Sequence, residues 1–332
     1  MSANPSQETG GVLPRNPRRV LRLAYPLGFC SGVRRALSLC HWLLADCPGR
    51  PLYVLRDLVH NHQVSRQLRE EGVVFVEEVS QVPRGGRLLL GAHGTTRETL
   101  ALCRQRQLEV HDATCPVILH LQNQLRRLPR EATVCLLGEA GHPEILALQD
   151  CLRERRCYLV ANPQEAAALA TLPPNPFFFS QTSRDREELK EVQRILTEKA
   201  PRLHNRAQLC PIQRVRQDAL AEMAPQCDRV FILGSSHSAN GRRLLQLARK
   251  HCPGPCRMLE EGEDLPPEEL AGVDTVGLAS ATSTPDDLVE EWVAHFRRLG
   301  FLPPDEEAPP AGKEAPPCGT RETNPVNPRS HE

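Results

Sequence analysis

Aromatic side chains and long apolar runs are scarce in this chain of 332 residues. Aromatic residues make up 4% of it, which leaves few flat surfaces on which nucleic-acid bases could stack. The 41 basic and 41 acidic residues cancel, so no overall charge attracts nucleic acid or an anionic membrane. The sequence has no run of about 18 apolar residues that could cross a bilayer, and its first residues lack the apolar stretch of a secretory signal. We therefore expect a cytoplasmic protein that binds neither nucleic acid nor membrane.

The middle of the chain has the pattern of an α/β protein. Both ends are polar and rich in proline, so we expect residues 1–18 and 303–332 to be disordered. Between them, short β-like runs alternate with helical patterns, which is typical of βαβ units and a mostly parallel sheet. The predicted pairs of strand and helix are 22–28 with 33–44, 51–55 with 62–72, 86–94 with 97–107, 109–115 with 116–128, 133–141 with 143–152, 177–183 with 186–196, 229–241 with 242–250, and 274–284 with 285–296.

Three of the 13 cysteines share a local context that the other ten lack. Cys30 in GFCSGV, Cys115 in ATCPVI and Cys210 in QLCPIQ each lie between an extended segment and a predicted helix start. A thiol at a helix start meets the positive end of the helix dipole, which lowers its pKa and favours the thiolate that metals bind. Separations of 85 and 95 residues (30 to 115, 115 to 210) indicate that three similar α/β units could each supply one ligand.

Composition and spacing leave two interpretations of these cysteines open. They are either buried cysteines at tight strand-to-helix turns, or three thiolate ligands of a metal centre with an open position. Such a centre would be a catalytic iron–sulfur cluster or a catalytic zinc. A further pair, Cys252 and Cys256 in HCPGPC, could be half of a zinc site, but it has two prolines and no matching second pair.

Polar side chains gather where the predicted strands end. His60, His93 and His142 each follow an apolar strand, and any one of them alone could be structural. Together with neighbouring hydroxyl and amide groups they form a donor-rich surface that suits a phosphate or diphosphate; these neighbours are Thr182, Ser183, Ser238, Asn240 and Ser283. Glu144 in GHPE either complements a helix dipole or, in a dry pocket beside a cluster, delivers the proton of a reduction.

Seven segments follow one another along the chain: GFCSGVRRAL, YVLRDLVHN, AHGTTRE, DATCP, GEAGHPE, SQTS and GSSHSANGRRL. In this order and at these separations they resemble the LytB family of 4-hydroxy-3-methylbut-2-enyl diphosphate reductases, over roughly residues 20–300. The resemblance implies an α/β fold with three similar lobes in a trefoil, each with a small, mostly parallel sheet, around a central cavity. We expect lobes at 19–115, 116–210 and 211–302, with the opening strand of the first joining the third.

The resemblance also implies a chemistry. Cys30, Cys115 and Cys210 would hold a [4Fe-4S] cluster with one open iron, and Glu144, helped by Thr182 and His142, would deliver a proton. The implied residues for binding the diphosphate are His60, His93, His142, Ser238, Asn240 and Ser283. The reaction would be the last step of the non-mevalonate isoprenoid pathway, the reductive dehydroxylation of (E)-4-hydroxy-3-methylbut-2-enyl diphosphate to isopentenyl and dimethylallyl diphosphate. Ferredoxin or flavodoxin would supply the electrons, and the enzyme would be a monomer or homodimer.

Three positions depart from the pattern of the family. Gln213 stands where a hydroxyl is expected, Val215 replaces an asparagine, and Ala239 interrupts a Ser-Ser-Asn sequence. We expect each change to remove or move a donor to the diphosphate, and one lost charge-assisted contact can cost roughly 1.5–3 kcal/mol. Two alternatives therefore stay open: a divergent paralogue acting on another small phosphorylated alcohol, and a non-catalytic redox sensor that binds a cluster or zinc.

Overall fold

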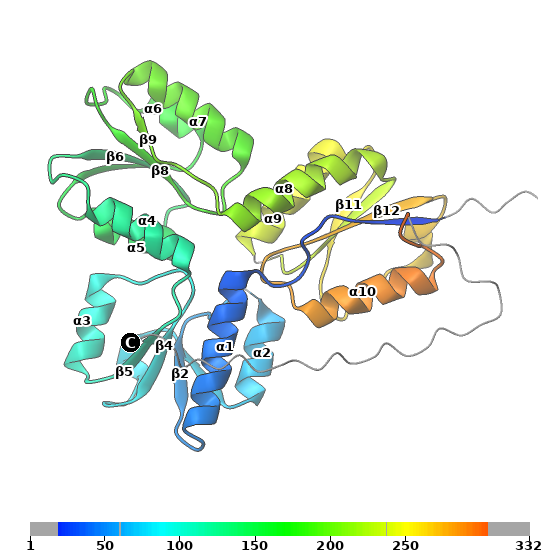
Figure 1. Ribbon diagram of the computed structural model, residues 1–332, viewed down its shortest axis with the longest axis horizontal. Coiled ribbons are helices and arrows are strands. Elements are labelled where there is room, and N and C mark those ends of the chain that lie inside the picture. The colour runs from blue at the N-terminus through cyan, green and yellow to red at the C-terminus, as the bar shows by residue number, and fades with distance from the viewer. Residues whose placement is uncertain (1–18, 60, 237, 305–332) are drawn as a thin grey trace, which may run out of the picture.

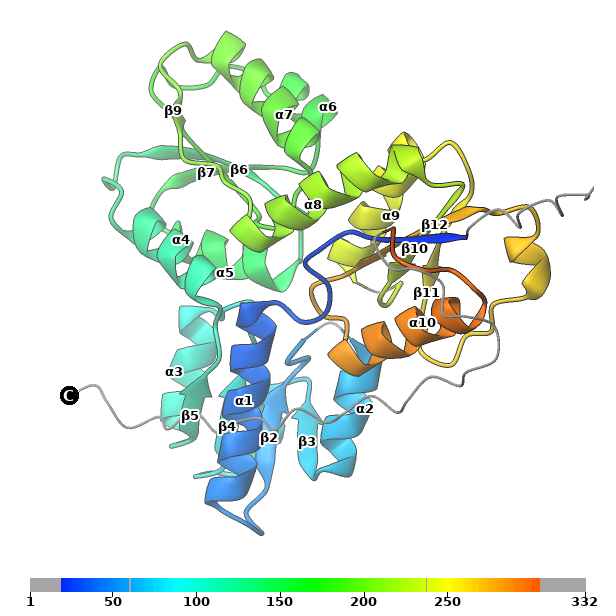
Figure 2. The same ribbon diagram turned by 45° about the vertical axis from the view of Figure 1, so that its right-hand side comes forward.

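The computed structural model describes residues 19–59, 61–236 and 238–304. Of the two end segments expected to be disordered, 1–18 lies outside these residues, and so does 303–332 except for Pro303 and Pro304. Three lobes surround a common centre (Figures 1 and 2). Each contains one four-stranded sheet, and every pairing between neighbouring strands is parallel. The predicted α/β fold with three similar lobes is confirmed.

In the first lobe the strand order is β3-β2-β4-β5. Its elements are α1 (Ser31–Asp46), β2 (Leu52–Leu55), α2 (His62–Glu70), β3 (Val73–Val76), η1 (Val79–Gln81), β4 (Arg87–Leu90), α3 (Arg97–Gln105) and β5 (Glu109–Asp112).

The second lobe repeats this order as β7-β6-β8-β9. Its elements are α4 (Pro116–Arg126), β6 (Thr133–Leu137), α5 (Pro143–Cys151), β7 (Arg156–Val160), α6 (Pro163–Ala168), β8 (Phe177–Ser180), α7 (Arg186–Lys199) and β9 (His204–Asn205).

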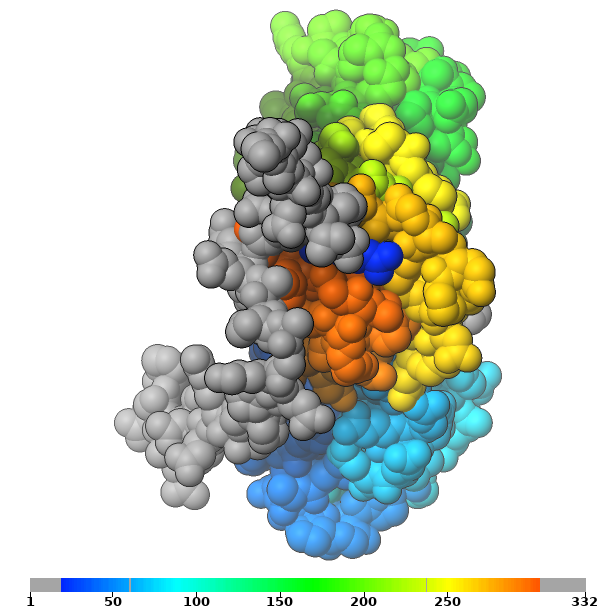
Figure 3. Space-filling model, turned by 90° about the vertical axis from the view of Figure 1, so that its right-hand side faces the viewer, coloured from blue at the N-terminus to red at the C-terminus, as the bar shows by residue number. Residues whose placement is uncertain are grey.

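The third lobe has the order β11-β10-β12-β1, so its fourth strand comes from the other end of the chain. Its elements are β1 (Val20–Leu23), α8 (Pro211–Met223), η2 (Ala224–Gln226), β10 (Arg229–Leu233), α9 (Ala239–His251), β11 (Cys256–Leu259), η3 (Pro267–Leu270), β12 (Thr275–Ser280) and α10 (Asp286–Arg298). Val20 of β1 is in register with Thr275 of β12, and Leu21 is fully buried. In Figure 3 the start of β1 is a small blue patch among the orange and yellow atoms of this lobe.

Each sheet is covered on both faces, which explains the apolar character of its central strands. In β4, Leu88 and Leu90 pack into one buried cluster while Leu89 packs into another, because successive side chains of a strand point to opposite faces. All residues of β4 and of β6 are buried. Burying one leucine side chain contributes roughly 1.5–3 kcal/mol, so these continuous runs place the central strands at the core of each lobe.

Several elements of the fold were not predicted from the sequence. The strand β9 has only two residues, and β3, β7 and β11 are edge strands with partly exposed side chains. The short helix α6 was also missed. The strands β9 and β11 lack a continuous apolar run, so the sequence pattern does not reveal them, whereas β3 (VVFV) and β7 (RCYLV) contain short apolar runs that were overlooked.

Polar contacts join the lobes at their interfaces. Between the first and second lobes, buried Asp150 accepts hydrogen bonds from the backbone N–H of Arg97 at 2.9 Å and from its side-chain Nε at 3.2 Å. Between the first and third lobes, the Asn61 amide donates to the Ser283 carbonyl at 2.9 Å. The lobes are therefore held together by specific hydrogen bonds. Within the part of the chain that the structure describes, no helix is both long and apolar enough to cross a membrane.

Candidate active site

Cys30, Cys115 and Cys210 occupy equivalent places in the three lobes. Each is the N-cap residue of a helix: α1, α4 and α8 respectively. Each also follows the edge strand that pairs with β12, β4 or β8. Their backbone N–H groups donate to carbonyls in the loops after those paired strands: Cys30 to Thr282 at 3.0 Å, Cys115 to Ala92 at 2.9 Å, and Cys210 to Thr182 at 2.9 Å. The repeated lobe thus places three thiols at the centre of the trefoil.

Burial has the largest effect on the pKa of two of these thiols. It raises the pKa of Cys115 and of Cys210, while backbone N–H groups of the following helical turn act in the opposite direction. The sequence predicted a net lowering by the helix dipole, and this was wrong because desolvation in the cavity is the larger effect. A bound metal would supply the positive charge that keeps these sulfurs deprotonated.

A glycine leaves room beside two of the sulfurs. A Cβ atom placed on Gly32 would lie 3.0 Å from the Cys115 Sγ and 3.7 Å from the Cys30 Sγ, so a side chain here would fill the space between them. Among residues 19–59, 61–236 and 238–304, no three His, Cys, Asp or Glu side chains are placed to share a single metal ion. In an iron–sulfur cluster each thiolate binds a different iron, and the open space beside Gly32 fits such a group.

One cavity of about 120 Å³ gathers the predicted site residues. It is lined by the three cysteines and by side chains from all three lobes, among them His93, His142, Glu144, Thr182, Ser183, Ser238, Asn240 and Ser283. Each of these residues lies in the loop or helix start that follows a strand, as the sequence predicted. The predicted phosphate ligand His60 lies outside the described residues.

Glu144 is the buried acid of this cavity. It is the second residue of α5, in the first turn of that helix, and only 2% of its surface is exposed. Thr182 donates its backbone N–H to one carboxylate oxygen at 2.7 Å and its hydroxyl to the other at 3.1 Å. Burial raises the pKa of Glu144 to about 7, although the two hydrogen bonds from Thr182 oppose this rise. The carboxyl group can therefore both hold and release a proton near neutral pH.

His142 caps the helix that carries Glu144. Its Nδ1 accepts the backbone N–H of Glu144 at 3.1 Å. In the neutral ring the hydrogen is therefore on Nε2. The rings of His142 and His93 meet edge to face, with 5.8 Å between their centres. The two histidines thus come from neighbouring lobes and lie side by side in the cavity lining.

Two buried amides lie at another part of the cavity. The side-chain nitrogens of Gln213 and Asn240 approach the Thr282 hydroxyl at 3.5 and 3.4 Å. Their amide oxygens are buried and have no hydrogen-bond partner in the part of the chain that the structure describes. Ser238 caps α9 through the Gly241 N–H. This end of the cavity therefore offers an amide at Gln213 in place of the expected hydroxyl.

The other two departures have different positions. Ala239 lines the cavity without contributing a polar group, as expected from its side chain. Val215 lies on the surface of α8 with 45% of its side chain exposed, and it is not part of the cavity lining. The sequence-based expectation that Val215 removes a donor to the ligand is therefore not supported by its position.

Sequence reasoning missed residues that support the cavity from behind. Arg216, which is 3% exposed, donates to the Ser280 and Ala281 carbonyls at 2.8 Å each. Desolvation lowers its pKa to about 10. Thr282, the hydroxyl between the two amides, was also missed. A single arginine or threonine carries no sequence signal that tells whether it is buried, so only the fold could identify them.

Comparisons with known proteins agree with this geometry. The family model described as "LytB protein" matches residues 21–297. The chain belongs to the LytB family. A relative from Actinobacillus succinogenes, named 4-hydroxy-3-methylbut-2-enyl diphosphate reductase, is 35% identical over 284 residues, which are 84% of this chain and 90% of the relative. A relative of the same name from Hahella chejuensis is 34% identical over 87% of this chain and 92% of its own length.

Two solved structures of LytB-type reductases share the fold. The E-1-hydroxy-2-methyl-but-2-enyl-4-diphosphate reductase of Plasmodium falciparum superposes with a TM-score of 0.80 at 26% identity, covering 90% of this chain and 96% of that one. A second, described as the terminal enzyme of the non-mevalonate pathway, gives a TM-score of 0.63 at 29% identity and covers 84% and 99%.

Proposed function

We propose that this LytB-family chain is an iron–sulfur reductase that converts (E)-4-hydroxy-3-methylbut-2-enyl diphosphate to isopentenyl and dimethylallyl diphosphate. The proposal extends to this chain the activity named for its relatives. The observation that carries it is the buried Glu144, held by Thr182 in the same cavity as Cys30, Cys115 and Cys210. A reductive loss of water requires a proton donor and a source of electrons, and three thiolates could hold the cluster that supplies those electrons.

We assign the three cysteines as ligands of a [4Fe-4S] cluster. The cavity beside Gly32 and the soft thiolate donors fit such a group. When bound, the cluster supplies electrons one at a time and an iron with an open coordination position. Replacement of the substrate hydroxyl by hydrogen takes up two electrons and two protons and releases one water.

The chain's own residues bind the substrate and supply a proton. His93, His142 and the amide Asn240, together with the hydroxyls of Ser238 and Ser283 and with His60, are assigned to the diphosphate, because hydrogen-bond donors from several lobes can surround its oxygens. Glu144 gives up its proton inside the cavity, and Thr182 fixes the orientation of its two oxygens. Burial of Glu144 excludes bulk water from this transfer.

A second candidate substrate deserves a test because of Gln213 and Ala239. The unpartnered amide oxygens of Gln213 and Asn240 are acceptors, and a fully ionised phosphate offers them no hydrogen. Another small phosphorylated alcohol, which brings its own hydroxyl donor to this end of the cavity, would satisfy them. Comparing the two substrate classes in one assay separates a reductase of the family's usual specificity from a divergent paralogue.

We also propose the cellular setting of this enzyme. Ferredoxin or flavodoxin is the expected electron donor, because the reaction takes up two electrons and the cluster passes them one at a time. The balance of 41 basic and 41 acidic residues favours no nucleic-acid partner. We further propose that the enzyme acts in the cytoplasm as a monomer or homodimer.

The test is an anaerobic assay of the full chain with its reconstituted cluster. Oxidation of reduced methyl viologen is followed after addition of (E)-4-hydroxy-3-methylbut-2-enyl diphosphate, and the products are identified by mass spectrometry. Substrate-dependent oxidation with both five-carbon diphosphates as products is expected. An intact cluster with no oxidation would contradict the proposed substrate, and a chain that binds no iron would contradict the iron–sulfur assignment.

A further inference from the structure

Gln181 joins the two loops that carry Glu144 and Thr182. It follows the last residue of β8, and its backbone N–H donates to the Leu137 carbonyl at 2.7 Å, which extends the pairing of β8 with β6 by one residue. The side chain is 2% exposed and carries no charge. A buried amide in this place must satisfy both its oxygen and its nitrogen within the protein.

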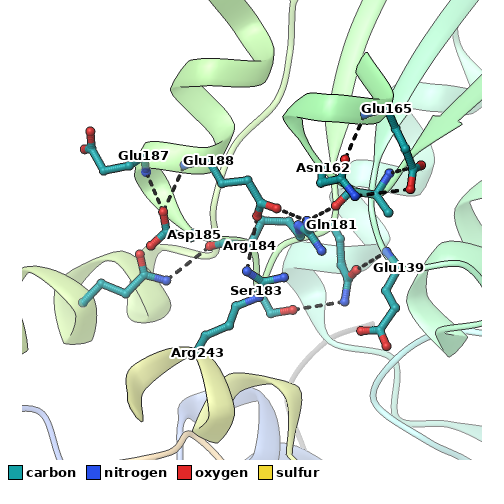
Figure 4. Close-up of polar contacts among 12 residues, drawn as sticks. Glu139, Asn162, Glu165, Gln181, Ser183, Arg184, Asp185, Glu187, Glu188 and Arg243 are labelled. Carbon is teal, nitrogen blue, oxygen red and sulfur yellow. Dashed lines mark hydrogen bonds and ion pairs between the residues drawn. The ribbon is translucent and has the colours of Figure 1, made fainter. Parts of the chain in front are cut away.

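The side chain of Gln181 satisfies both groups with residues of different loops. Its oxygen accepts the backbone N–H of Glu139 at 3.0 Å, and its nitrogen donates to the Ser183 hydroxyl at 3.1 Å. Figure 4 shows Gln181 between Glu139 and Ser183, joined to both by dashed lines. One amide thus links the end of β6 to the end of β8.

A glycine makes this close approach of the loop and the amide possible. A Cβ atom on Gly138 would lie 3.3 Å from the Gln181 side-chain oxygen and 2.1 Å from Cδ1 of Ile145. The loop after β6 therefore packs against Gln181 with no room for a side chain. The position of this loop is set by the amide on one side and by α5 on the other.

The two linked loops end at the two partners of the acid contact. Thr182 is the next residue after Gln181, and the Glu139 loop leads within five residues to Glu144. Thr182 holds Glu144 through bonds of 2.7 and 3.1 Å, lengths that a shift of one loop would break. Gln181 itself is not part of the cavity lining, although it donates to the hydroxyl of one lining residue, Ser183.

We propose that Gln181 is the positioning residue that sets the alignment of Thr182 with Glu144 and so the rate of proton delivery. This inference rests on the proposed function, since it assigns Gln181 to the proton step of that reaction. It predicts a selective effect: the proton step slows, whereas the diphosphate, bound by other residues, is held as before. A residue needed only for folding would show no such separation.

The test compares Gln181→Met with Gln217→Met in the full, cluster-loaded enzyme. Methionine has a similar length but cannot form either hydrogen bond. Gln217 is an equally suitable buried control, since it is 5% exposed and donates to the Arg184 carbonyl at 3.2 Å without linking the two loops. For each variant we would measure kcat, KM, iron content, and the affinity for inorganic diphosphate by calorimetry.

The expected result for Gln181→Met is a kcat lower by about 10- to 100-fold, with KM and diphosphate affinity within about twofold of the wild type. Gln217→Met should keep its kcat within about twofold. An unchanged kcat in Gln181→Met would overturn the inference, and so would equal losses of kcat, iron and diphosphate affinity in both variants. If Gln181→Met does not fold, Gln181→Asn decides by the same criteria, because its shorter amide cannot reach both loops.

Failure of this inference differs from failure of the proposed function. If the wild-type chain shows no turnover of the allylic diphosphate, the proposed function is wrong. If the wild type turns over and Gln181→Met does so equally fast, only the role of Gln181 is wrong.

Discussion

At the scale of single residues, the chemistry of the cavity depends on how burial changes protonation. Glu144 loses the hydration of its charged form and gains only the two hydrogen bonds of Thr182 in return, so its pKa rises to about 7. The same desolvation raises the pKa of the Cys115 and Cys210 thiols. One environment thus favours a protonated acid and makes the thiols dependent on a metal for their ionisation.

The pH dependence of turnover follows from Glu144. A proton donor must carry its proton, so kcat should be constant below pH 7 and fall about tenfold per pH unit well above it. Because hydrogen bonds to a carboxylate lower its pKa, Thr182→Val should move this alkaline limb to higher pH, as well as lowering kcat. Rate profiles of both proteins between pH 5 and 9 at saturating substrate, roughly the range in which such groups titrate, provide the check. A limb that does not move in Thr182→Val would contradict the assignment of Glu144.

The stability of the folded chain should depend on the same carboxyl group. Its pKa is raised from 4.5 to about 7 on folding, so the folded state binds more protons than the unfolded state between these values. The free energy of unfolding should therefore fall by about 3 kcal/mol as the pH rises from 4.5 to 7. The free energy of unfolding of Glu144→Gln should not show this fall with pH, and at pH 8 it should be higher than that of the wild type. Urea titrations of the metal-free proteins at several pH values would measure this difference. If the free energies of unfolding of the two proteins changed in parallel with pH, Glu144 would not be a buried, protonated group.

The assignment of the thiols is testable one cysteine at a time. Cys115→Ser should lose most of the bound iron and change the cluster spectrum, because serine is a harder and less easily ionised ligand. Cys47→Ser is the matched control, since Cys47 is a partly buried thiol at the far end of α1. Iron analysis and visible absorption after anaerobic reconstitution decide the outcome. Full iron content in Cys115→Ser would remove it from the ligand set.

At the scale of elements, the starts of three helices determine where the cluster can be held. Pro116 and Pro211 occupy the first turns of α4 and α8, where a missing N–H costs no hydrogen bond. In α1 the equivalent turn contains Gly32, and its missing side chain leaves the space beside two sulfurs open. Helix geometry and the size of one residue therefore act together at the site.

Gly32→Ala separates helix stability from cluster binding. Alanine favours a helix by up to about 1 kcal/mol over glycine, and the close contact of its Cβ with the Cys115 Sγ opposes this gain, so the metal-free protein should stay within about 1 kcal/mol of the wild type. Its Cβ would lie 3.0 Å from the Cys115 Sγ, so iron content should fall at least severalfold. The exposed neighbour Ser31, changed to Ala, should retain its iron. Thermal melts with iron analysis would test this, and a fully loaded Gly32→Ala would contradict the fit of the group beside Gly32.

The sequence could predict those elements and site residues that leave a pattern. Continuous apolar runs such as Arg87–Leu90 and Thr133–Leu137 marked the central strands, and the repeated strand, cysteine and helix start identified Cys30, Cys115 and Cys210. Edge strands such as Cys256–Leu259 left no such run. The sequence also did not predict how deeply each side chain is buried. It therefore could not predict the pKa of a thiol at a helix start, which depends on how much protein covers the sulfur. For the same reason Gln213 could be noted as unusual, but not placed against Thr282.

At the scale of the whole molecule, the three lobes depend on contacts between them. The cavity exists only where all three lobes meet, and each lobe supplies one cysteine-bearing helix and one loop whose carbonyl accepts the backbone N–H of a cysteine. The strand β1 closes the arrangement by joining the first residues of the described chain to the sheet of the last lobe. Loosening one interface should therefore weaken the site as a whole.

Asp150 is the residue at which this dependence can be measured. It is 5% exposed and holds Arg97 across the interface of the first two lobes. Asp150→Ala should lower the free energy of unfolding by about 1–3 kcal/mol, because it removes the buried acceptor of the partly buried Arg97 N–H and of the Arg97 and Arg153 side chains. Asp218→Ala is the control, since its ion pair with Arg186 also crosses between lobes but is half exposed, and its loss should cost less than about 1 kcal/mol. Denaturant titration distinguishes them, and equal effects would contradict a role for the buried contact.

The central claim is that a cavity formed by three lobes places a buried acid beside a metal centre held by three cysteines. Its most direct test is the turnover of (E)-4-hydroxy-3-methylbut-2-enyl diphosphate by Glu144→Gln and by the wild type, with iron content measured on the same samples. We predict equal iron content and a kcat at least about 100-fold lower in Glu144→Gln, the size of effect typical of a lost proton donor. A Glu144→Gln protein that turns over at the wild-type rate with its cluster intact would contradict the account.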